Sequence, residues 1–352
     1  MTVYLEVQAH SRHKELHWLV EEIVKPMFPR LIETLHLCSN LLLYNSPEHP
    51  DPNSHIKRGP SITLAVSSGK LEELKGILVR DGAHVTKINV VLKEKHFNRL
   101  VNRVQLAKPF LLPQIIQAKR SIDNAVELIV RALSLLDAPP GERGDTASSC
   151  NLDVESETAA DVKYAQQAHI MLMSVFTDLL HELQIAKNSL QLPTEPALVF
   201  PKHVTPAGMF EPDISSSVAV DVYISQAEVC VDLKDLHVVT EKPWCEIDET
   251  TGKSYADQVR EQILRKKEVE TEQDVRAADA GVLGLFKQLL RKPRYETQDY
   301  IARCVTFNKQ VVIVNKKIEV LTADPILVSA FTKLDSVEHM VSSFLENIKK
   351  LI

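Results

Sequence analysis

The chain has 352 residues, a formal net charge of −6, 44% hydrophobic residues and 25% charged residues, which is an ordinary globular composition. The acidic balance argues against a dedicated nucleic-acid surface, because such surfaces carry a strong basic bias. No apolar run approaches the roughly 20 residues that span a bilayer, and residues 1–14 lack the apolar segment of a secretory signal. We therefore expect a soluble cytoplasmic protein.

The cysteines are odd in number, and none of them falls in a C-x-x-C pair. The five positions are Cys38, Cys150, Cys230, Cys245 and Cys304. Disulfide frameworks and zinc sites use paired or closely spaced cysteines, which this sequence lacks. We expect reduced thiols that are mostly buried as packing groups.

Four segments carry apolar residues at spacings of three and four, which indicates helices that face a core. They lie at about residues 12–44, 113–136, 162–190 and 327–351. In the last two segments the apolar positions alternate strictly between these spacings. A sustained average of 3.5 residues imposes the left-handed seam of coiled coils and helical bundles.

Prolines should shape two of these helices. Pro26 and Pro29 should kink or interrupt the first helix, because proline removes an amide donor and clashes with the preceding turn. Asp324 and Pro325 favour the start of the last helix, since aspartate caps free amides and proline is tolerated in the first turn.

Between the helices the apolar period changes to two, which is typical of half-buried antiparallel strands. Asp81-Gly82, between residues 76–80 and 84–92, predicts a hairpin because both turn positions tolerate positive φ. The alternating positions are Ile62, Leu64, Val66, Val218, Val220, Val222, Ile224, Val229, Val231, Leu233, Val311, Ile313, Ile318 and Val320.

Helices therefore bracket and interrupt two blocks of strands. The simplest α+β assembly is an antiparallel four-helix bundle with leucine-zipper-like seams, joined to an antiparallel β-rich lobe, both discontinuous in sequence. The same heptads could instead mediate homodimerisation. The expected helical domain is 12–44, 110–190 and 324–352, the β domain is 60–108 and 196–323, an acidic loop is 137–161, and a charged, partly helical insertion is 241–300.

Within the insertion, residues 253–296 resemble a loop rich in Glu, Lys, Arg and Gln. Their second half, residues 281–292, interleaves apolar and basic side chains, a pattern that suits a membrane surface or an acidic partner. The alternative is a helix that packs on its own β lobe. The candidate partner-binding residues are Leu283, Phe286, Lys287, Leu289, Leu290, Arg291 and Lys292.

The sequence lacks the motifs of known catalytic chemistry. There is no G-x-G-x-x-G or G-x-S-x-G motif, and Gly69-Lys70 lacks the upstream glycine of a Walker A loop. His13 and His17 are four residues apart, but no further ligand cluster accompanies them, so a solvated turn fits better than a metal site. His169 lies on an apolar helix face, where a hydrogen-bonded core histidine is expected. We predict no catalytic, cofactor-binding or metal-binding residue, and no enzyme activity.

One stretch of the sequence resembles the signature order of the Rogdi family. The resemblance extends to residues 115–120, to the helix before the signature and to residues 303–348. The signature consists of Leu192-Pro193, Phe200-Pro201, Met209-Phe210-Glu211-Pro212, Val220-Asp221-Val222-Tyr223-Ile224, Val229-Cys230-Val231 and Leu236-His237.

The resemblance implies a four-helix leucine-zipper-like domain joined to a β domain, and a non-enzymatic role. For fungal members of the family, the resemblance implies the smaller subunit of the RAVE complex. That complex promotes rejoining of the V1 and Vo sectors of the vacuolar proton ATPase. The implied partners are the large propeller-bearing RAVE subunit, the small Skp1 adaptor and V1 subunits, at vacuolar and endosomal membrane surfaces. Two alternatives stay open: a coiled-coil subunit of another assembly, such as a vesicle tether, and a protein with a small-molecule pocket between its lobes.

Overall fold

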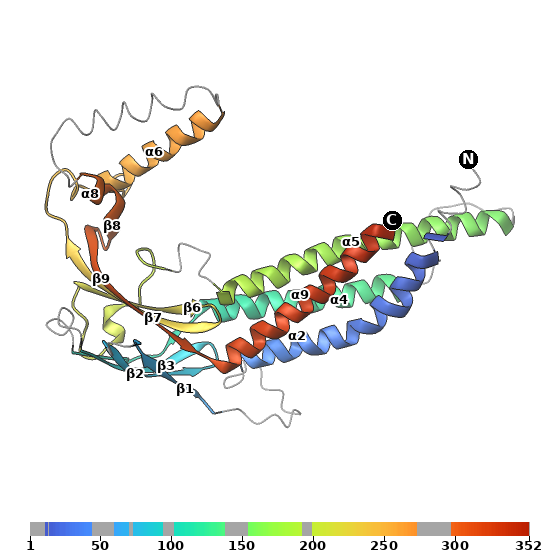
Figure 1. The fold of residues 1–352 in the computed structure, drawn as a ribbon, viewed down its shortest axis with the longest axis horizontal. Coiled ribbons are helices and arrows are strands. Elements are labelled where there is room, and N and C mark those ends of the chain that lie inside the picture. The colour runs from blue at the N-terminus through green and yellow to red at the C-terminus, as the bar shows by residue number, and fades with distance from the viewer. Residues whose placement is uncertain are drawn as a thin grey trace.

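The structure is a computed structural model in which helices combine with two antiparallel sheets, as expected for an α+β chain. Figure 1 shows long helices extending together from one end of the sheets. The residues that the structure describes are 11–12, 14–43, 60–69, 73–93, 102–137, 154–191, 199–272 and 297–351.

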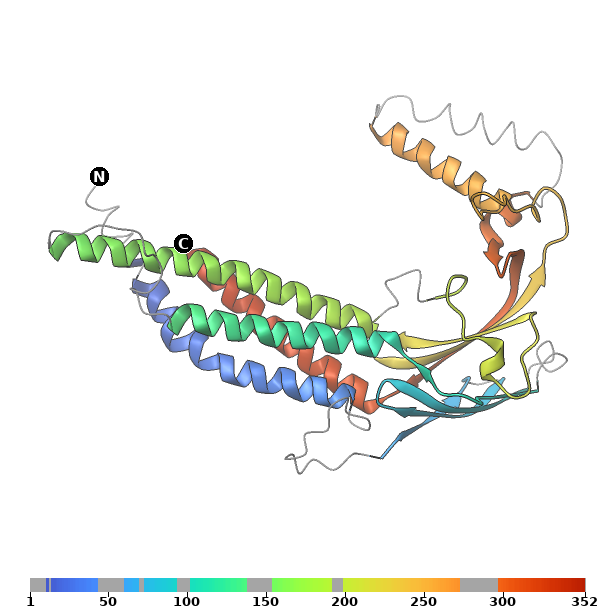
Figure 2. The ribbon, with the colours of Figure 1, turned by 180° about the vertical axis from the view of Figure 1, so that it is seen from behind.

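Four long helices lie side by side: α2 (Phe28–Leu42), α4 (Pro113–Asp137), α5 (Val154–Gln191) and α9 (Pro325–Leu351). Helix α2 contacts α4 and α9, and α5 contacts the same two helices, so each helix has two neighbours. Neighbours run in opposite directions, since each helix leaves or returns to the sheets at the same end (Figures 1 and 2).

Most of the predicted apolar positions in the described parts of these helices are buried, and Val126, Leu133 and Leu136 of α4 are partly buried. Phe28 and Phe176 meet edge to face across the core, with ring centroids 6.0 Å apart. At the rim, the Lys187 ammonium group lies 2.5 Å from the carboxylates of both Asp335 and Glu338, which joins α5 to α9. The fully buried positions include Leu31, Leu35, Leu42, Ile115, Ile122, Ile129, Leu172, Leu179, Leu183, Leu327, Leu334 and Val341.

The prolines interrupt the first helix as predicted. A π-helical turn, η1 (Leu19–Val24), and a 3-10 turn, η2 (Lys25–Met27), precede α2. Pro26 and Pro29 have no amide hydrogen to donate to the preceding turn, so the regular α-helical ladder cannot continue through them. The apolar face nevertheless stays buried through Val20 and Val24.

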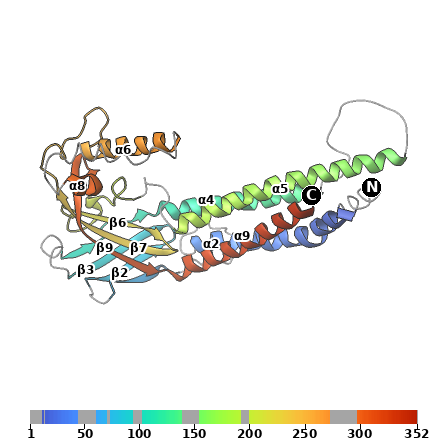
Figure 3. The ribbon, with the colours of Figure 1, turned by 45° about the horizontal axis from the view of Figure 1, so that its top comes forward.

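Part of the predicted acidic loop is helical, so that prediction was wrong for residues 154–161. Helix α5 begins at Val154, and Figure 3 shows it extending beyond its neighbours. The segment holds Glu and Ala, which favour a helix by intrinsic propensity even where no apolar face repeats. Residues 138–153 lie outside the described part of the chain.

The first sheet contains β1 (Ile62–Ser67), β2 (Leu74–Asp81), β3 (His84–Leu92), β4 (Arg103–Gln105) and β5 (Phe110–Leu111). Strands β1 to β4 pair in sequence order, and β5 pairs with β3, all antiparallel. The predicted hairpin joins β2 to β3, but its turn lies one residue later, because Asp81 still pairs with His84. Gly82, at φ 57°, supplies the positive φ that the turn requires.

The second sheet contains β6 (Val218–Ser225), β7 (Glu228–Val238), β8 (Cys304–Phe307) and β9 (Gln310–Ala323), in the order β6-β7-β9-β8. The inward residues of both sheets join the helix seams in a single apolar cluster. The core therefore runs from the helices into the space between the sheets.

Strands β6 and β7 are buried on both faces, whereas half-buried strands were predicted. The segment of residues 199–206 covers their outer face, and Phe200 and Val204 pack there on a second apolar cluster that contains Ala219 and Leu236. The amide of Thr205 donates to the Val220 carbonyl at 3.1 Å, which ties the segment along the edge of β6. An alternating strand pattern describes only one face, so it did not predict this cover.

Two buried polar side chains join the helices to the sheets. The first is Arg80, whose Nε donates to Asp324 Oδ2 at 2.7 Å, with both side chains fully buried. Its Nη1 donates to the carbonyl of Gly82 at 2.5 Å and to that of Leu42 at 3.3 Å. Because Asp324 Oδ1 also accepts the amide of Ile326 at 3.0 Å, one ion pair connects the end of α2, the hairpin and the start of α9.

The second is Gln114, at the start of α4. Its amide nitrogen donates to the carbonyls of Ser189 at 3.0 Å and Ile224 at 2.8 Å, and its oxygen accepts the Ile224 amide at 2.6 Å. The β6–β7 turn adds a cap, since the amides of Gln226 and Ala227 donate to the last carbonyls of α5. Arg80 and Gln114 thus connect all four helices to the two sheets.

Candidate functional site: a distal lobe

The predicted partner-binding residues, Leu283, Phe286, Lys287, Leu289, Leu290, Arg291 and Lys292, lie outside the described residues. The structure does describe the chain on both sides of them, in α6 (Tyr255–Glu272) and α8 (Thr297–Arg303). Both helices lie at the end of the second sheet that is remote from the long helices (Figure 1). We call residues 239–265 and 300–307 the distal lobe.

The distal lobe has its own small apolar cluster, separate from the main core. Val239, Ala256, Cys304 and Val311 are its buried members. Trp244 and Tyr300 pack against them. The indole of Trp244 stacks on Tyr300 with centroids 5.5 Å apart and meets Tyr255 edge-on at 5.3 Å. These rings connect the start of α6 to the middle of α8.

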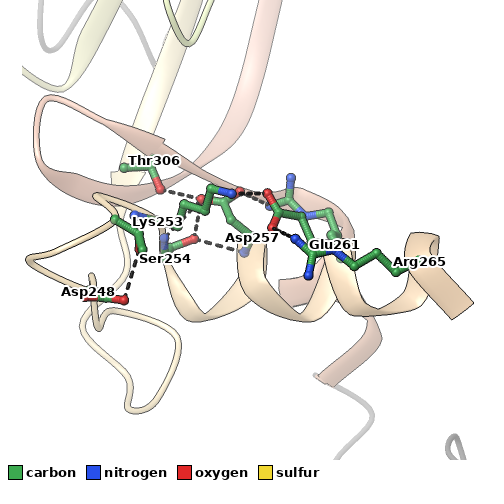
Figure 4. A network of polar contacts seen from close by, with 9 residues as sticks. Asp248, Lys253, Ser254, Asp257, Glu261, Arg265 and Thr306 are labelled. Atoms are coloured by element: carbon green, nitrogen blue, oxygen red, sulfur yellow. Dashed lines mark hydrogen bonds and ion pairs between the residues drawn. The ribbon is translucent and has the colours of Figure 1, made fainter.

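A polar network fastens the first turn of α6 (Figure 4). Ser254 and Asp257 cap the helix reciprocally: the Asp257 amide donates to the serine oxygen at 3.2 Å, and the serine hydroxyl and amide donate to Asp257 Oδ2 at 2.7 and 3.1 Å. The hydroxyl of Thr306 on β8 donates to the same oxygen at 2.7 Å. The cap is therefore also a tie between α6 and the sheet.

Electrostatic interactions further stabilise this connection between α6 and the sheet. Burial opposes ionisation of Asp257, but the hydrogen bonds from Thr306 and Ser254 and the guanidinium of Arg260 outweigh it and lower the pKa of the carboxyl. Arg260 lies 3.3 Å from Asp257 Oδ1 and also donates to the carbonyl of Cys304. Lys253 pairs with Glu261 one turn further along.

Removing the Asp257 carboxylate should loosen α6. We expect Asp257→Ala to lower the stability of the lobe by about 1 kcal/mol, the usual contribution of a helix cap, seen as faster amide exchange in residues 255–263. Because the pKa of Asp257 is lowered in the folded state, this stabilisation is present above the ordinary carboxyl pKa and is lost as the pH falls through the lowered value. Glu249→Ala, an exposed carboxylate in the same lobe, should leave exchange unchanged; equal effects of the two substitutions would contradict the assignment.

Beyond its anchored turn, α6 projects from the sheets (Figure 2) and presents an apolar group to solvent. Leu264 is 59% exposed, beside the charged Glu261 and Arg265. Among residues 255–265, the part of this helix whose side chains the structure describes, only Ala256 and Val259 are buried. A helix held at its base, with an exposed leucine among charges, can bind a partner.

Three of the cysteines, Cys38, Cys230 and Cys304, are buried, as expected for packing groups. Burial raises the pKa of the Cys38 and Cys304 thiols to about 11 and that of Cys230 to about 12, which disfavours the nucleophilic thiolate. His169 is buried on α5, as expected for a core histidine, and His17 is exposed. Across the described ranges, no group of three or more His, Cys, Asp or Glu side chains is arranged to hold a metal ion.

Sequence reasoning missed the aromatic cluster of Trp244, Tyr255 and Tyr300, because these residues are far apart in a segment rich in charge. A signal was present in Ser254 and Asp257, which form the S-x-x-D pattern of a helix start. None of the helices that the structure describes is both long and apolar enough to cross a bilayer.

Comparison with known proteins adds a family to this architecture. The chain is 24% identical over 351 residues to the Saccharomyces cerevisiae protein named regulator of V-ATPase in vacuolar membrane protein 2, an alignment that covers 95% of this chain and 90% of that protein. It is also 24% identical over 243 residues to the Danio rerio protein rogdi homolog, covering 68% of this chain and 72% of the relative. The family model for Rogdi leucine zipper containing protein matches residues 15–349, so the chain belongs to that family.

Proposed function

We propose that this chain is a non-enzymatic adaptor subunit of a RAVE-type complex, the regulator of the ATPase of vacuoles and endosomes. In this role it promotes assembly and reassembly of the V1 sector with the Vo sector of the vacuolar proton ATPase, and so supports vacuolar acidification. The observation that carries the proposal is the similarity over 95% of the chain to a yeast protein named as a regulator of the V-ATPase.

We interpret the four long helices as an antiparallel bundle with leucine-zipper-like seams. Buried apolar faces and the ring of contacts among α2, α4, α5 and α9 support this interpretation. The domain division that goes with it assigns 12–44, 110–190 and 324–352 to the bundle and 60–108 and 196–323 to the β domain. The ties through Arg80 and Gln114 favour a stiff body, which loses little conformational entropy on binding.

The proposed partners follow from this role. The large propeller-bearing RAVE subunit is the direct partner, accompanied by the Skp1 adaptor and V1 subunits, in the cytoplasm with recruitment to vacuolar and endosomal membrane surfaces. We assign docking to the distal lobe and to the candidate residues Leu283, Phe286, Lys287, Leu289, Leu290, Arg291 and Lys292. The exposed Leu264 on the anchored helix α6 supports this assignment.

Mild affinity purification from cytosolic extract, with mass spectrometry of the retained proteins, tests the proposal. Recovery of V1 subunits with a large propeller protein is the expected result. Recovery of vesicle-tether coiled-coil proteins without V1 would instead support the alternative assignment to another cytosolic assembly.

The same purification tests the distal lobe. Leu264→Asp places a charge at the exposed apolar position, and we expect about tenfold less recovery of the propeller subunit, equivalent to the loss of about 1.4 kcal/mol of binding free energy. Val130→Asp is the matched control, since Val130 is a comparably exposed apolar residue on α4. Unchanged recovery for Leu264→Asp, or an equal loss for the control, would remove the lobe from the docking surface.

A further inference from the structure

A cavity opens at the surface where residues 199–206, the residues just before β6 and the turn between β8 and β9 come together. Its volume is about 400 Å³, which lies in the range of about 300–1,000 Å³ that is usual for ligand pockets. The lining comes from three stretches of chain that are remote from one another in sequence. The tertiary fold therefore fixes the shape of this cavity.

The buried part of the lining is mainly apolar. Ile214 and Val218 are each 6% exposed, and Val220 is 2% exposed. Phe307 forms part of the wall, and its ring packs on the ring of Phe200 with centroids 5.4 Å apart. Because these contacts already hold the wall in place, an apolar ligand would meet a preformed surface at little cost in ordering.

The rim of the cavity is polar and carries a positive charge. Ser215, Ser216 and Asn308 are exposed lining residues. Lys202, also exposed, is the one charged residue that lines the cavity, and no ion pair between described residues involves it. An apolar group that carries a single negative charge would therefore complement both the wall and the rim.

We propose that this cavity binds an apolar side chain of a partner protein, of the size of leucine or an aromatic residue, with a carboxylate beside it that pairs with Lys202. The apolar side chain lies against Ile214, Val218 and Phe307, and the carboxylate stays at the rim. A large apolar side chain seated in a preformed pocket is the kind of contact that carries most of the binding energy at protein interfaces.

The position of the cavity favours a segment of a partner protein over a free small molecule. Phe307 belongs to the distal lobe and Asn308 follows it directly, so the cavity adjoins the surface to which we assign docking. The inference rests on that proposed function and specifies the chemistry of the partner. It also adds a second contact to the one at Leu264, on a different part of the surface.

Indole-3-acetate and tryptamine test the chemistry of the cavity in the full chain, because they carry the same ring and opposite charges. The methyl resonances of Val218 and Val220 should shift with indole-3-acetate. Its Kd should be about fivefold lower than that of tryptamine, equivalent to about 1 kcal/mol for an exposed ion pair. Lys202→Glu should reverse this preference. Lys87→Glu, the same charge change at an exposed position on β3, should leave it intact.

The affinity purification described above tests whether the ligand is a partner protein. Lys202→Glu should lower recovery of the propeller subunit by about fivefold, as for the loss of one exposed ion pair. Ser216→Trp, which places a large ring at the rim, should lower recovery at least as much and should weaken binding of indole-3-acetate. Lys87→Glu should recover as much as the wild type. Lys202 and Ser216 are exposed, so neither substitution should unfold the chain.

The possible outcomes separate this inference from the proposed function. Absence of methyl shifts with both compounds, or equal affinity for them, would overturn the assignment of the cavity. Wild-type recovery that is unchanged in both Lys202→Glu and Ser216→Trp would exclude the cavity from the docking surface and leave the proposed function standing. If the wild type recovers no propeller subunit, the proposed function fails and the partner fails with it. A preference for indole-3-acetate would then indicate a site for a free apolar carboxylate instead.

Discussion

Arg80→Met should destabilise the chain by about 3–5 kcal/mol, the expected loss when one partner of a buried ion pair is removed. Asp324 would lose its positive partner in a fully buried position, and the carbonyls of Leu42 and Gly82 would lose their donor. The free energy of unfolding from urea titration measures the loss. Fluorescence and circular dichroism should report it alike, because the ion pair connects helices to sheets.

A second substitution at Asp324 provides the control. Arg80→Met combined with Asp324→Asn removes the orphaned charge while leaving an oxygen that can accept the amide of Ile326. The double variant should therefore be more stable than Arg80→Met alone. A double variant as unstable as the single one would show that the buried charge is not what the arginine compensates.

Gln114→Leu should have the second largest effect, a loss of about 3 kcal/mol. Leucine fills much of the same volume but leaves the amide of Ile224 and the carbonyls of Ser189 and Ile224 buried without this partner, at about 1–3 kcal/mol for each group that water fails to reach. The same urea titration measures the change. Amide exchange at Ile224 should accelerate more than exchange in the middle of α4.

Gln117→Leu is the matched control on the same helix, because Gln117 is only partly buried. Surface substitutions of this kind usually change stability by less than about 0.5 kcal/mol. Equal losses for the two variants would mean that Gln114 acts only through its helix and not as a tie between α4, α5 and β6.

The helices could be predicted because the information that specifies them is local. A face repeated every three and four residues records burial along each segment, and the positions from Leu172 to Leu190 are buried as that repeat predicts. The start of α5 could not be found in this way, since residues 154–161 carry helix propensity without an apolar repeat. The prolines were informative for the same reason as the apolar repeats, because their effect on a helix depends on no distant residue.

The polar ties could not be predicted because their partners are remote in sequence. Arg80 and Asp324 are separated by 244 positions, and each alone reads as a surface residue in a strand or at a helix start. The cover over β6 and β7 has the same origin: Asp221 occupies the position of the strand pattern that normally faces solvent. That face is buried only because residues 199–206 lie over it.

The sequence indicated part of the secondary structure of the distal lobe. It indicated a charged, partly helical insertion at 241–300, and α6 lies within it. The interpretation of residues 253–296 as a loop was wrong for residues 255–272, which form that helix. The sequence did not indicate that Trp244 and Tyr300 stack to anchor the insertion, since pairing of distant aromatic residues leaves no periodic signal. The assignment of Leu283 to Lys292 as partner-binding residues stays a prediction.

Strand β9 continues almost directly into helix α9, so one stretch of backbone runs from the distal lobe to the far end of the helices. Strand β9 begins beside the distal lobe, where Val311 joins the lobe's cluster, and only Asp324 separates it from α9. At ordinary rises per residue, the strand and helix together span about 90 Å. A force applied to the distal lobe would be transmitted along this continuous backbone. The buried Arg80–Asp324 pair lies at the junction of the strand and the helix. A force exerted by a partner on the distal lobe would therefore reach the far end of the helices without any change of fold.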